Sequence, residues 1–330
     1  MNFQDLLKVE TPKTYIDIAF ARAKKSADDV RAQTKGSRLI KSRRVEAEKI
    51  TSINSALSKP LQKILESFPS LHRLDTFYLE LIKLTLDYRE LKRALGAVNW
   101  CKKAVNKISD QYLSKIRRAT EFETINAMRR EYYGRVSSII KQIKENLEYL
   151  EKARKVMKGY PAIKTGMFTV CICGFPNVGK STLLAKISTA TPEIKEYAFT
   201  TKELNTGYVK EGYIKVQLID TPGTLNRFEK MNTIEKMAYL AVLHCADAII
   251  YVYDLTEPYP LTDQQKLYNR YGVYKRPMLV YLSKTDVLDR AIIERFHKHG
   301  MATSPSEVRK LVIELGRKHM KRERGVVHEK

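Results

Sequence analysis

The stretch Gly174-Phe-Pro-Asn-Val-Gly-Lys-Ser181 fits the pattern G-x-x-x-x-G-K-[ST]. An apolar run over residues 167–173 precedes it, and a helical pattern beginning at Thr182 follows it. A glycine-rich turn between a strand and a helix aims backbone N–H groups and a helix N-terminus at one point, which suits a polyphosphate. The alternative interpretation is a chance glycine turn before a helix, and the flanking strand and helix and three further motifs downstream argue against it. The sequence therefore predicts a nucleoside triphosphate site.

The residues of this loop have distinct expected roles. We expect Lys180 to neutralise the β- and γ-phosphates and the Ser181 hydroxyl to bind Mg²⁺. The full set expected to surround the phosphates from this segment is Gly174, Asn177, Val178, Gly179, Lys180, Ser181 and Thr182.

Two further segments are typical of a nucleotide-dependent switch. Asp220-Thr-Pro-Gly223 follows the apolar run 214–219, so Asp220 is expected to hold Mg²⁺ through water and the Gly223 N–H to contact the γ-phosphate. Between the two motifs lies Tyr197-Ala-Phe-Thr-Thr-Lys202. Of Thr200 and Thr201 we prefer Thr201 as the switch threonine that closes over Mg²⁺. The alternative is a threonine pair at the start of a strand.

Ser283-Lys284-Thr285-Asp286 follows the apolar run 278–282 and resembles N-K-x-D. In such loops the aspartate accepts hydrogen bonds from guanine N1 and N2, donors that adenine lacks, and the lysine stem covers the base. Ser283 stands where asparagine is usual, so a hydrogen bond that tethers the loop is expected to be lost or shortened. Thr303 and Ser304 are expected to support the guanine O6.

The rest of the chain predicts a fold of class α + α/β. Apolar runs 214–219, 248–253 and 278–282, separated by helical stretches, predict a mostly parallel, doubly wound sheet. Helical stripes fill the first half, including one from Leu74 to Val98 and one from Val136 to Met157, and predict an antiparallel bundle. The expected domains are a basic helical domain (1–163), a P-loop domain (164–316) and a basic C-terminal tail (317–330).

Positive charge is concentrated in the first half of the chain. The formal net charge is +23, and residues 1–160 carry 34 Lys and Arg against 19 Asp and Glu. Such a cluster favours binding to the phosphates of RNA, although a generally basic proteome is an alternative explanation. Trp100, beside a weaker basic cluster, is interpreted as a core residue rather than a base-stacking platform. The RNA-binding candidates are Arg22, Lys24, Lys25, Arg31, Lys35, Arg38, Lys41, Arg43 and Arg44.

Other features limit the range of functions. No run of about 20 apolar residues predicts a membrane-spanning helix. The four cysteines give neither a disulfide framework nor a zinc quartet, so they are interpreted as buried apolar residues in a reducing cytosol. A membrane-associated role fits poorly, because the helical stripes read as core. A monomer is expected when the protein is free.

The motifs GFPNVGKS, YAFTTK and DTPG, with the segment NTIEKMAYLAVLHCADAIIYVYD, resemble the Obg-like branch of translation-factor-class GTPases. In the helical half, YRELKRALGAVN from Tyr88, IIKQIKENLEYLE from Ile139 and YPAI from Tyr160 resemble the nucleolar Nog family. The resemblance implies a GTPase that uses GTP or GDP and Mg²⁺ and assists large-ribosomal-subunit assembly by docking on ribosomal RNA. On this basis the chain is identified as an archaeal-type, cytoplasmic member.

The resemblance also sets expectations about rate. Thr224 follows Gly223 where many switch GTPases place a water-orienting glutamine, so slow unaided hydrolysis is expected. Asn177 resembles the position that holds K⁺ in potassium-stimulated GTPases, and the alternative is an asparagine that stabilises the turn. A second hypothesis for the whole protein is a nucleotide-binding RNA placeholder with little or no turnover.

Overall fold

The computed structural model describes residues 3–189, 204–221, 233–256 and 259–327. Contacts divide the chain into two compact units. The bundle comprises residues 3–73 and 86–158, and the sheet unit contains residues 74–85 and the chain from 159 onward. None of the helices in the described ranges combines the length and the hydropathy needed to cross a membrane.

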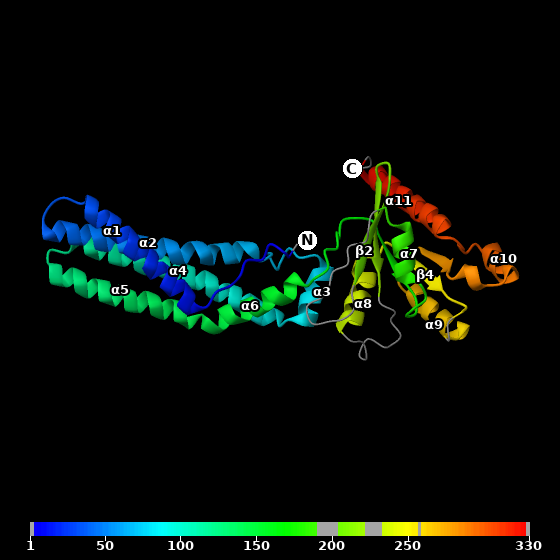
Figure 1. The fold of residues 1–330 in the computed structure, drawn as a ribbon, viewed down its shortest axis with the longest axis horizontal. Helices are drawn as coiled ribbons and strands as arrows, with labels where there is room; N and C mark the ends of the chain where they lie inside the picture. The colour runs from blue at the N-terminus through cyan, green and yellow to red at the C-terminus, as the bar shows by residue number, and fades with distance from the viewer. Residues whose placement is uncertain (1–2, 190–203, 222–232, 257–258, 328–330) are drawn as a thin grey trace. The chain divides into compact units, whose positions relative to one another are not determined.

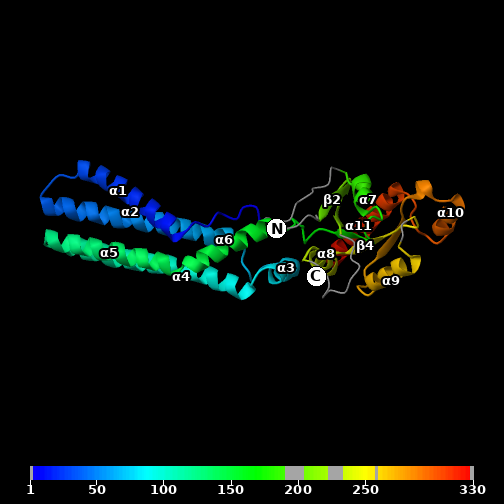
Figure 2. The same cartoon turned by 60° about the horizontal axis from the view of Figure 1, so that its bottom comes forward.

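Long helices with buried apolar stripes form the bundle (Figures 1 and 2). The stripe of the second helix is buried through Ile50, Ile53, Leu57 and Leu61. Each such side chain contributes roughly 1.5–3 kcal/mol when it leaves water. The side chain of Thr11 caps the N-terminus of the first helix, and that of Ser37 caps the N-terminus of the second. The helices are α1 (Pro12–Gln33), α2 (Arg38–Ser67), α4 (Tyr88–Arg118), α5 (Phe122–Gln142) and α6 (Lys144–Lys158).

The uninterrupted helix expected from Leu74 to Val98 is wrong. Helix α3 (Thr76–Thr85) ends first, and α4 begins at Tyr88. Asp87 lies between them in an extended conformation, and its carboxylate accepts hydrogen bonds from the backbone N–H groups of Arg89 and Glu90 at 2.9 and 3.0 Å. An aspartate followed three residues later by glutamate is a helix-start signal, and this signal overrides the continuous apolar spacing.

The second long pattern is also interrupted, at Ile143. This residue leaves helical geometry with φ −96° and ψ 19°, so that α5 ends at Gln142 and α6 starts at Lys144. Ile143 itself remains buried. The apolar spacing therefore predicted the buried positions but not the break.

The sheet unit contains a five-stranded sheet in the order β2-β3-β1-β4-β5. All neighbouring pairs are parallel except β2 with β3. The expected mostly parallel, doubly wound sheet is therefore confirmed. The antiparallel edge strand β2 was not expected, because its sequence, NTGYVKE, lacks an apolar run. The strands are β1 (Thr169–Cys173), β2 (Asn205–Glu211), β3 (Ile214–Asp220), β4 (Ala248–Tyr253) and β5 (Met278–Leu282).

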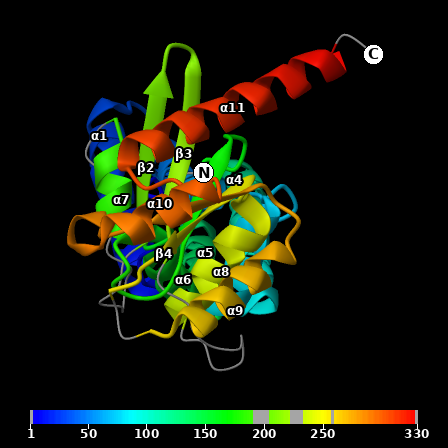
Figure 3. The same cartoon turned by 90° about the vertical axis from the view of Figure 1, so that its right-hand side faces the viewer.

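Helices cover this sheet, and Figure 3 shows α11 crossing the hairpin formed by β2 and β3. The close crossing depends on Gly316, because a Cβ there would lie 2.9 Å from a Val216 methyl carbon. Helix α11 continues to Val327, so the basic residues 317–322 lie on its final turns. The helices are α7 (Lys180–Ile187), α8 (Thr233–Cys245), α9 (Leu261–Gly272), α10 (Arg290–Lys298) and α11 (Pro305–Val327), with a short 3₁₀ turn at Thr285–Val287.

Helix α3 belongs to the sheet unit although bundle segments flank it in the sequence. It packs on α8, and its buried Tyr78 holds the segment that leads into β1. The Tyr78 hydroxyl lies 2.9 Å from both the Pro161 and Ile163 carbonyl oxygens, and it accepts a hydrogen bond from the Ile163 N–H at 3.0 Å. Burial raises the pKa of this hydroxyl well above its usual value, so Tyr78 stays protonated and able to donate.

Candidate functional site

The loop from β1 to α7 requires glycine at two positions. Gly174 has φ 148°, and a Cβ there would lie 2.7 Å from the Val252 carbonyl oxygen. Gly179 has φ 91° and lies immediately before the first residue of α7. Asn177 is also left-handed, with φ 62°, a conformation that asparagine tolerates better than most residues. The loop therefore has the tight backbone path expected of a phosphate cradle.

Lys180 lies within this loop. Its side chain is 6% exposed, and its ammonium donates a hydrogen bond to the Phe175 carbonyl oxygen at 2.6 Å. Burial lowers the pKa of Lys180, while the nearby Asp220 carboxylate opposes that shift. The ammonium is thus held beside the loop backbone with most of its hydration removed, which strengthens its attraction to an added anion.

Asp220, at the carboxyl end of β3, faces Ser181 and Asn205. The Ser181 hydroxyl donates to Asp220 Oδ2, and Asn205 Nδ2 lies 3.5 Å from the same oxygen. Asp220 Oδ1 and Asn205 Oδ1 are buried, and neither has a hydrogen-bond partner within the described residues. Burial raises the pKa of Asp220, although the Ser181 hydrogen bond and the Lys180 charge partly offset the shift.

These unpartnered oxygens fit a hard divalent cation. Mg²⁺ binds oxygen ligands and often engages a carboxylate through its waters. Buried polar atoms without partners are rare, because each one costs free energy in the folded state. Sequence reasoning missed Asn205, and the signal that could have located it is its register opposite Asp220 in the β2–β3 hairpin.

The loop after β5 is attached to β4. The Ser283 N–H and the Ser283 hydroxyl each donate to the Tyr253 carbonyl oxygen at 2.9 Å. The Ser283 Cβ also lies 3.7 Å from the position a Cβ would take on Gly179. Ser283 therefore supplies a tether of its own, and it packs the base-side loop against the phosphate loop.

The other base-side candidates lie around this tether. Lys284 has a left-handed φ of 52°, and its ammonium pairs with Asp254 at 2.6 Å. Asp286 is exposed and has no ion-pair or hydrogen-bond partner among the described side chains. The Thr285 hydroxyl lies 3.4 Å from the Thr303 carbonyl oxygen, which brings the two base-side segments together.

Ser304 has a local structural role at the start of α11. Its hydroxyl accepts a hydrogen bond from the Glu307 N–H at 3.3 Å, and the Glu307 carboxylate accepts one from the Thr303 N–H at 2.9 Å. This arrangement resembles a helix capping box. It fixes the backbone of Thr303 and Ser304 beside the base-side loop.

Among the remaining phosphate-side candidates, Val178 is buried and Thr182 is exposed on the first turn of α7. Four others lie outside the described residues: Thr200, Thr201, Gly223 and Thr224.

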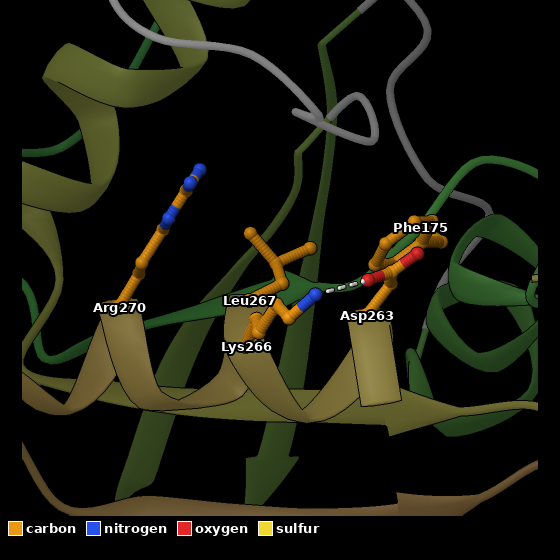
Figure 4. A pocket seen from close by; sticks show the side chains of 5 residues that line it. All are labelled: Phe175, Asp263, Lys266, Leu267 and Arg270. Carbon is orange, nitrogen blue, oxygen red and sulfur yellow. Dashed lines mark hydrogen bonds and ion pairs between the residues drawn. The ribbon is translucent and has the colours of Figure 1, made fainter. Parts of the chain in front are cut away.

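A small cavity of about 190 Å³ lies next to the phosphate loop, against Phe175 (Figure 4). Helix α9 supplies its other lining residues, Asp263, Lys266, Leu267 and Arg270. Lys266 pairs with Asp263 at 2.8 Å along the helix. None of the phosphate-contacting candidates is among these lining residues, so the cavity adjoins the candidate site without forming it.

The RNA-binding candidates all lie in the bundle, but they are not equivalent. The Arg43 Nε donates to the Ala119 carbonyl oxygen at 2.6 Å, and the Arg38 guanidinium lies 4.2 Å from the Phe122 ring centroid. Arg31 pairs with Asp28 at 3.1 Å. Arg22, Lys24 and Arg31, together with Lys25, lie on α1, Lys35 lies in the α1–α2 turn, and Arg38, Lys41, Arg43 and Arg44 lie on α2.

The contacts of Arg38 and Arg43 bring the α1–α2 and α4–α5 turns together at one end of the bundle, as Figures 1 and 2 show. Arg117 and Arg118, at the end of α4, are also exposed at this end of the bundle. Sequence reasoning missed them, because they lie far along the chain from the cluster on α1 and α2. The resulting surface is called the basic tip. Its exposed members are Lys35, Arg38, Lys41, Arg44, Arg117 and Arg118.

The order of these parts along the sheet is that of the P-loop GTPases: the phosphate loop follows β1, the magnesium-side aspartate ends β3 and the base-side loop follows β5. Two family models match the chain. The model of the NOG1 N-terminal helical domain matches residues 3–164, and that of the 50S ribosome-binding GTPase matches residues 169–284.

Individual relatives agree. An uncharacterized protein of Methanocaldococcus jannaschii is 35% identical over 87% of this chain and 81% of its own length. Nucleolar GTP-binding protein 1 of Arabidopsis thaliana is 30% identical over 92% of this chain and 47% of its own length, and that of Encephalitozoon cuniculi is 33% identical over 87% and 55%. The chain belongs to the Nog1-type family of GTP-binding proteins. It spans about half the length of the relatives that carry the nucleolar name.

Solved structures match less than half of the chain. The G domain of the T. maritima FeoB iron transporter covers 45% of this chain and 98% of its own, with 23% identity and a TM-score of 0.37. Aquifex aeolicus Era bound to GDP·AlF4⁻ covers 44% of this chain and 56% of its own, with 25% identity and a TM-score of 0.34.

Proposed function

We propose that this protein is a Mg²⁺-dependent GTPase that hydrolyses GTP slowly and acts in the assembly of the large ribosomal subunit. The observation that carries the nucleotide part is the set of buried, unpartnered oxygens of Asp220 and Asn205 beside Ser181, below a glycine-rich loop. In this proposal Ser181 binds Mg²⁺ directly, Asp220 binds it through water, and Thr201 completes the set. The cation supplies charge neutralisation at the phosphates.

Base selection is assigned to the loop after β5. Asp286, exposed and unpartnered within the described part of the chain, would accept hydrogen bonds from guanine N1 and N2. Thr303 and Ser304, fixed at the start of α11, would support the guanine O6. Adenine offers no such donors to Asp286, so guanine nucleotides are preferred.

The slow rate follows from Thr224, which is too short to orient water as glutamine does. Asn177 lies within the phosphate loop in a left-handed backbone conformation, and we assign it to a K⁺ site there. Turnover measured in KCl and in NaCl at equal ionic strength tests this part. A rate independent of the cation would remove K⁺ from the proposal.

The proposed partner is ribosomal RNA, bound by the basic tip. Its guanidinium and ammonium groups are exposed and come from two turns, so together they can follow a phosphate backbone. The names of the matching family model and of the relatives, 50S ribosome-binding GTPase and nucleolar GTP-binding protein 1, support the same assignment. A cytoplasmic location and a monomeric free state remain predictions.

Co-sedimentation with large ribosomal subunits and their precursors tests the function as a whole. It should be run with GDP, GTP and a non-hydrolysable GTP analogue, at two salt concentrations. Binding strengthened by the analogue and weakened by GDP is the expected result. Binding indifferent to nucleotide, with no turnover added by the particles, would instead establish a placeholder. No binding in any state would remove the ribosomal assignment.

The basic tip has a matched control within the bundle. Lys41→Glu with Arg44→Glu should weaken association by roughly tenfold or more and reduce its salt dependence, because phosphate contacts are lost. Lys152→Glu with Lys155→Glu, the same charge change at exposed positions of α6, should leave association nearly unchanged. Equal losses from the two pairs would show that net charge, not the basic tip, drives binding.

A further inference from the structure

Asp254 directly follows β4 and is not among the candidate site residues considered above. Its side chain is completely buried. Oδ1 accepts hydrogen bonds from the Thr256 N–H at 2.8 Å and the Thr256 hydroxyl at 2.7 Å. Oδ2 lies 2.6 Å from the Lys284 ammonium. A fully buried carboxylate is strongly destabilising without a counter-charge, so Asp254 commits the lysine to one position.

The backbone around Asp254 is fixed by α9. Gln264, which is 1% exposed, accepts a hydrogen bond from the Asp254 N–H at 3.1 Å and donates one to the Asp254 carbonyl oxygen at 2.6 Å. A buried amide that satisfies both groups of one residue holds that residue as a rigid part of the core. The carboxylate is therefore aimed before any ligand arrives.

Lys284 is held at both ends. Its backbone is fixed by the preceding Ser283, which makes two hydrogen bonds to the Tyr253 carbonyl oxygen, and its ammonium is fixed by Asp254. Its side chain remains about one third exposed. A free lysine side chain loses conformational entropy when it is ordered, and here that loss occurs in the folded protein rather than on binding.

We propose that Asp254 is a positioning residue for the guanine site: it fixes the Lys284 ammonium so that the lysine stem forms a ready-made apolar platform for one face of the base. This inference rests on the proposed function, because it assumes that the loop after β5 receives guanine. Asp254 touches no part of the ligand. It acts only through Lys284.

The proposal separates two contributions to base recognition. A platform contacts the ring face, so it favours any base of this shape, whereas Asp286 reads N1 and N2 at the ring edge. Inosine lacks the N2 amino group but keeps N1–H and the ring face. Asp254→Asn should therefore lower the affinities for GDP and for inosine diphosphate by the same factor, roughly tenfold for the loss of one charge-assisted contact. Asp286→Ala should instead weaken GDP more than inosine diphosphate.

A double-mutant cycle provides the decisive experiment, with affinities measured by calorimetric titration of the full chain. Lys284→Met keeps an unbranched apolar stem and removes the ammonium. In that background Asp254→Asn should cost no further GDP affinity, because its route of action is gone. An additive loss in the double variant, or an Asp254→Asn variant that binds GDP like the wild type, would overturn the proposal.

Two other variants guard against misinterpretation. Thr256→Val, at an exposed position, removes one of the hydrogen bonds that aim the carboxylate, and it should weaken both nucleotides about threefold even if Asp254→Asn fails to fold. Unchanged affinity in Thr256→Val would count against the proposal. Asp263→Asn removes a carboxylate that pairs with Lys266 on α9, and it should change neither nucleotide. If the wild-type chain bound no guanine nucleotide, the proposed function itself would be overturned. That outcome is distinct from the variant results, which test only the role of Asp254.

Discussion

At the phosphate end of the site, buried oxygens of Asp220 and Asn205 have no partner among the described residues, whereas at the guanine end Ser283 and Lys284 are already bonded to residues at the end of β4. The phosphate end thus depends on its ligand to satisfy buried polar groups. At the base end, Ser283 and Lys284 are held in place by the protein itself, so these two residues lose little order on binding. We therefore expect the phosphate end to determine most of the nucleotide affinity and its dependence on metal. The guanine end should adjust that affinity by smaller factors.

The largest expected effect is at Lys180. Lys180→Ala removes the buried ammonium that we propose neutralises the β- and γ-phosphates, so GDP and GTP affinity should fall roughly 100-fold or more. Fluorescence titration with a labelled GDP measures it. Lys186→Ala, at an exposed position of the same helix, is the matched control and should bind normally. A Lys180→Ala variant with near-normal GDP affinity would contradict the assignment of most of the affinity to the phosphate end.

Metal dependence should follow Asp220. Chelation of Mg²⁺ by EDTA should speed GDP release from the wild type roughly tenfold or more, because buried oxygens lose the cation that satisfies them. In Asp220→Asn the release should already be fast, and EDTA should add little. Stopped-flow release measurements distinguish the two cases. A variant that responds to EDTA as the wild type does would show that Asp220 is not at the metal.

A smaller effect is expected at Ser283. Ser283→Ala loses the hydroxyl bond to Tyr253 but keeps the backbone one, so GDP should bind roughly three- to tenfold more weakly. Ser283→Asn restores the usual motif but places a larger side chain at a 3% exposed position against Gly179. It should not bind GDP more tightly than the wild type. A clear gain in affinity would mean that the serine tether is a poor substitute.

The smallest effect concerns the thiols. Burial raises the pKa of Cys101 and Cys245 to about 12 and that of Cys173 to about 11. Because only the thiolate reacts, alkylation at pH 8.5 should be negligible in the native protein with or without GDP, and complete in urea. Because the thiol pKa values are higher in the folded than in the unfolded protein, the free energy of unfolding should be unaffected by these thiols below about pH 9 and should fall as the pH rises toward 12. Mass spectrometry after timed alkylation checks the first statement, and fast native labelling would contradict it.

Sequence reasoning worked where a short motif fixes its own surroundings. The strands ending at Cys173 and Asp220 and the glycine turn at Gly179 were placed from local spacing, because each requires a particular backbone path. It failed where contacts join distant segments. Asn205 opposite Asp220 depends on hairpin register, and Arg117 beside the α1–α2 turn depends on how the bundle helices pack.

The break between α3 and α4 was a different failure. The capping signal at Asp87 was present in the sequence, but the apolar spacing ran through it without interruption. At Ser283 the sequence predicted only that a tethering hydrogen bond would be lost or shortened, and the structure adds that Ser283 is bonded to the Tyr253 carbonyl oxygen. A substituted motif residue tells which bond is lost and does not tell which bond replaces it.

The membership of α3 in the sheet unit affects how the chain is made as well as how it is held. During synthesis α3 leaves the ribosome long before α8, its packing partner. The apolar face of α3 that packs on α8 therefore stays uncovered by α8 while the bundle segments on either side of it are synthesised. A fragment starting at residue 164 would lack helix α3, which packs on α8, and a fragment ending at residue 163 would carry α3 without α8. The chain enters the sheet unit at residues 74–85, returns to the bundle and re-enters the sheet unit at residue 159, so no single cut separates the two units.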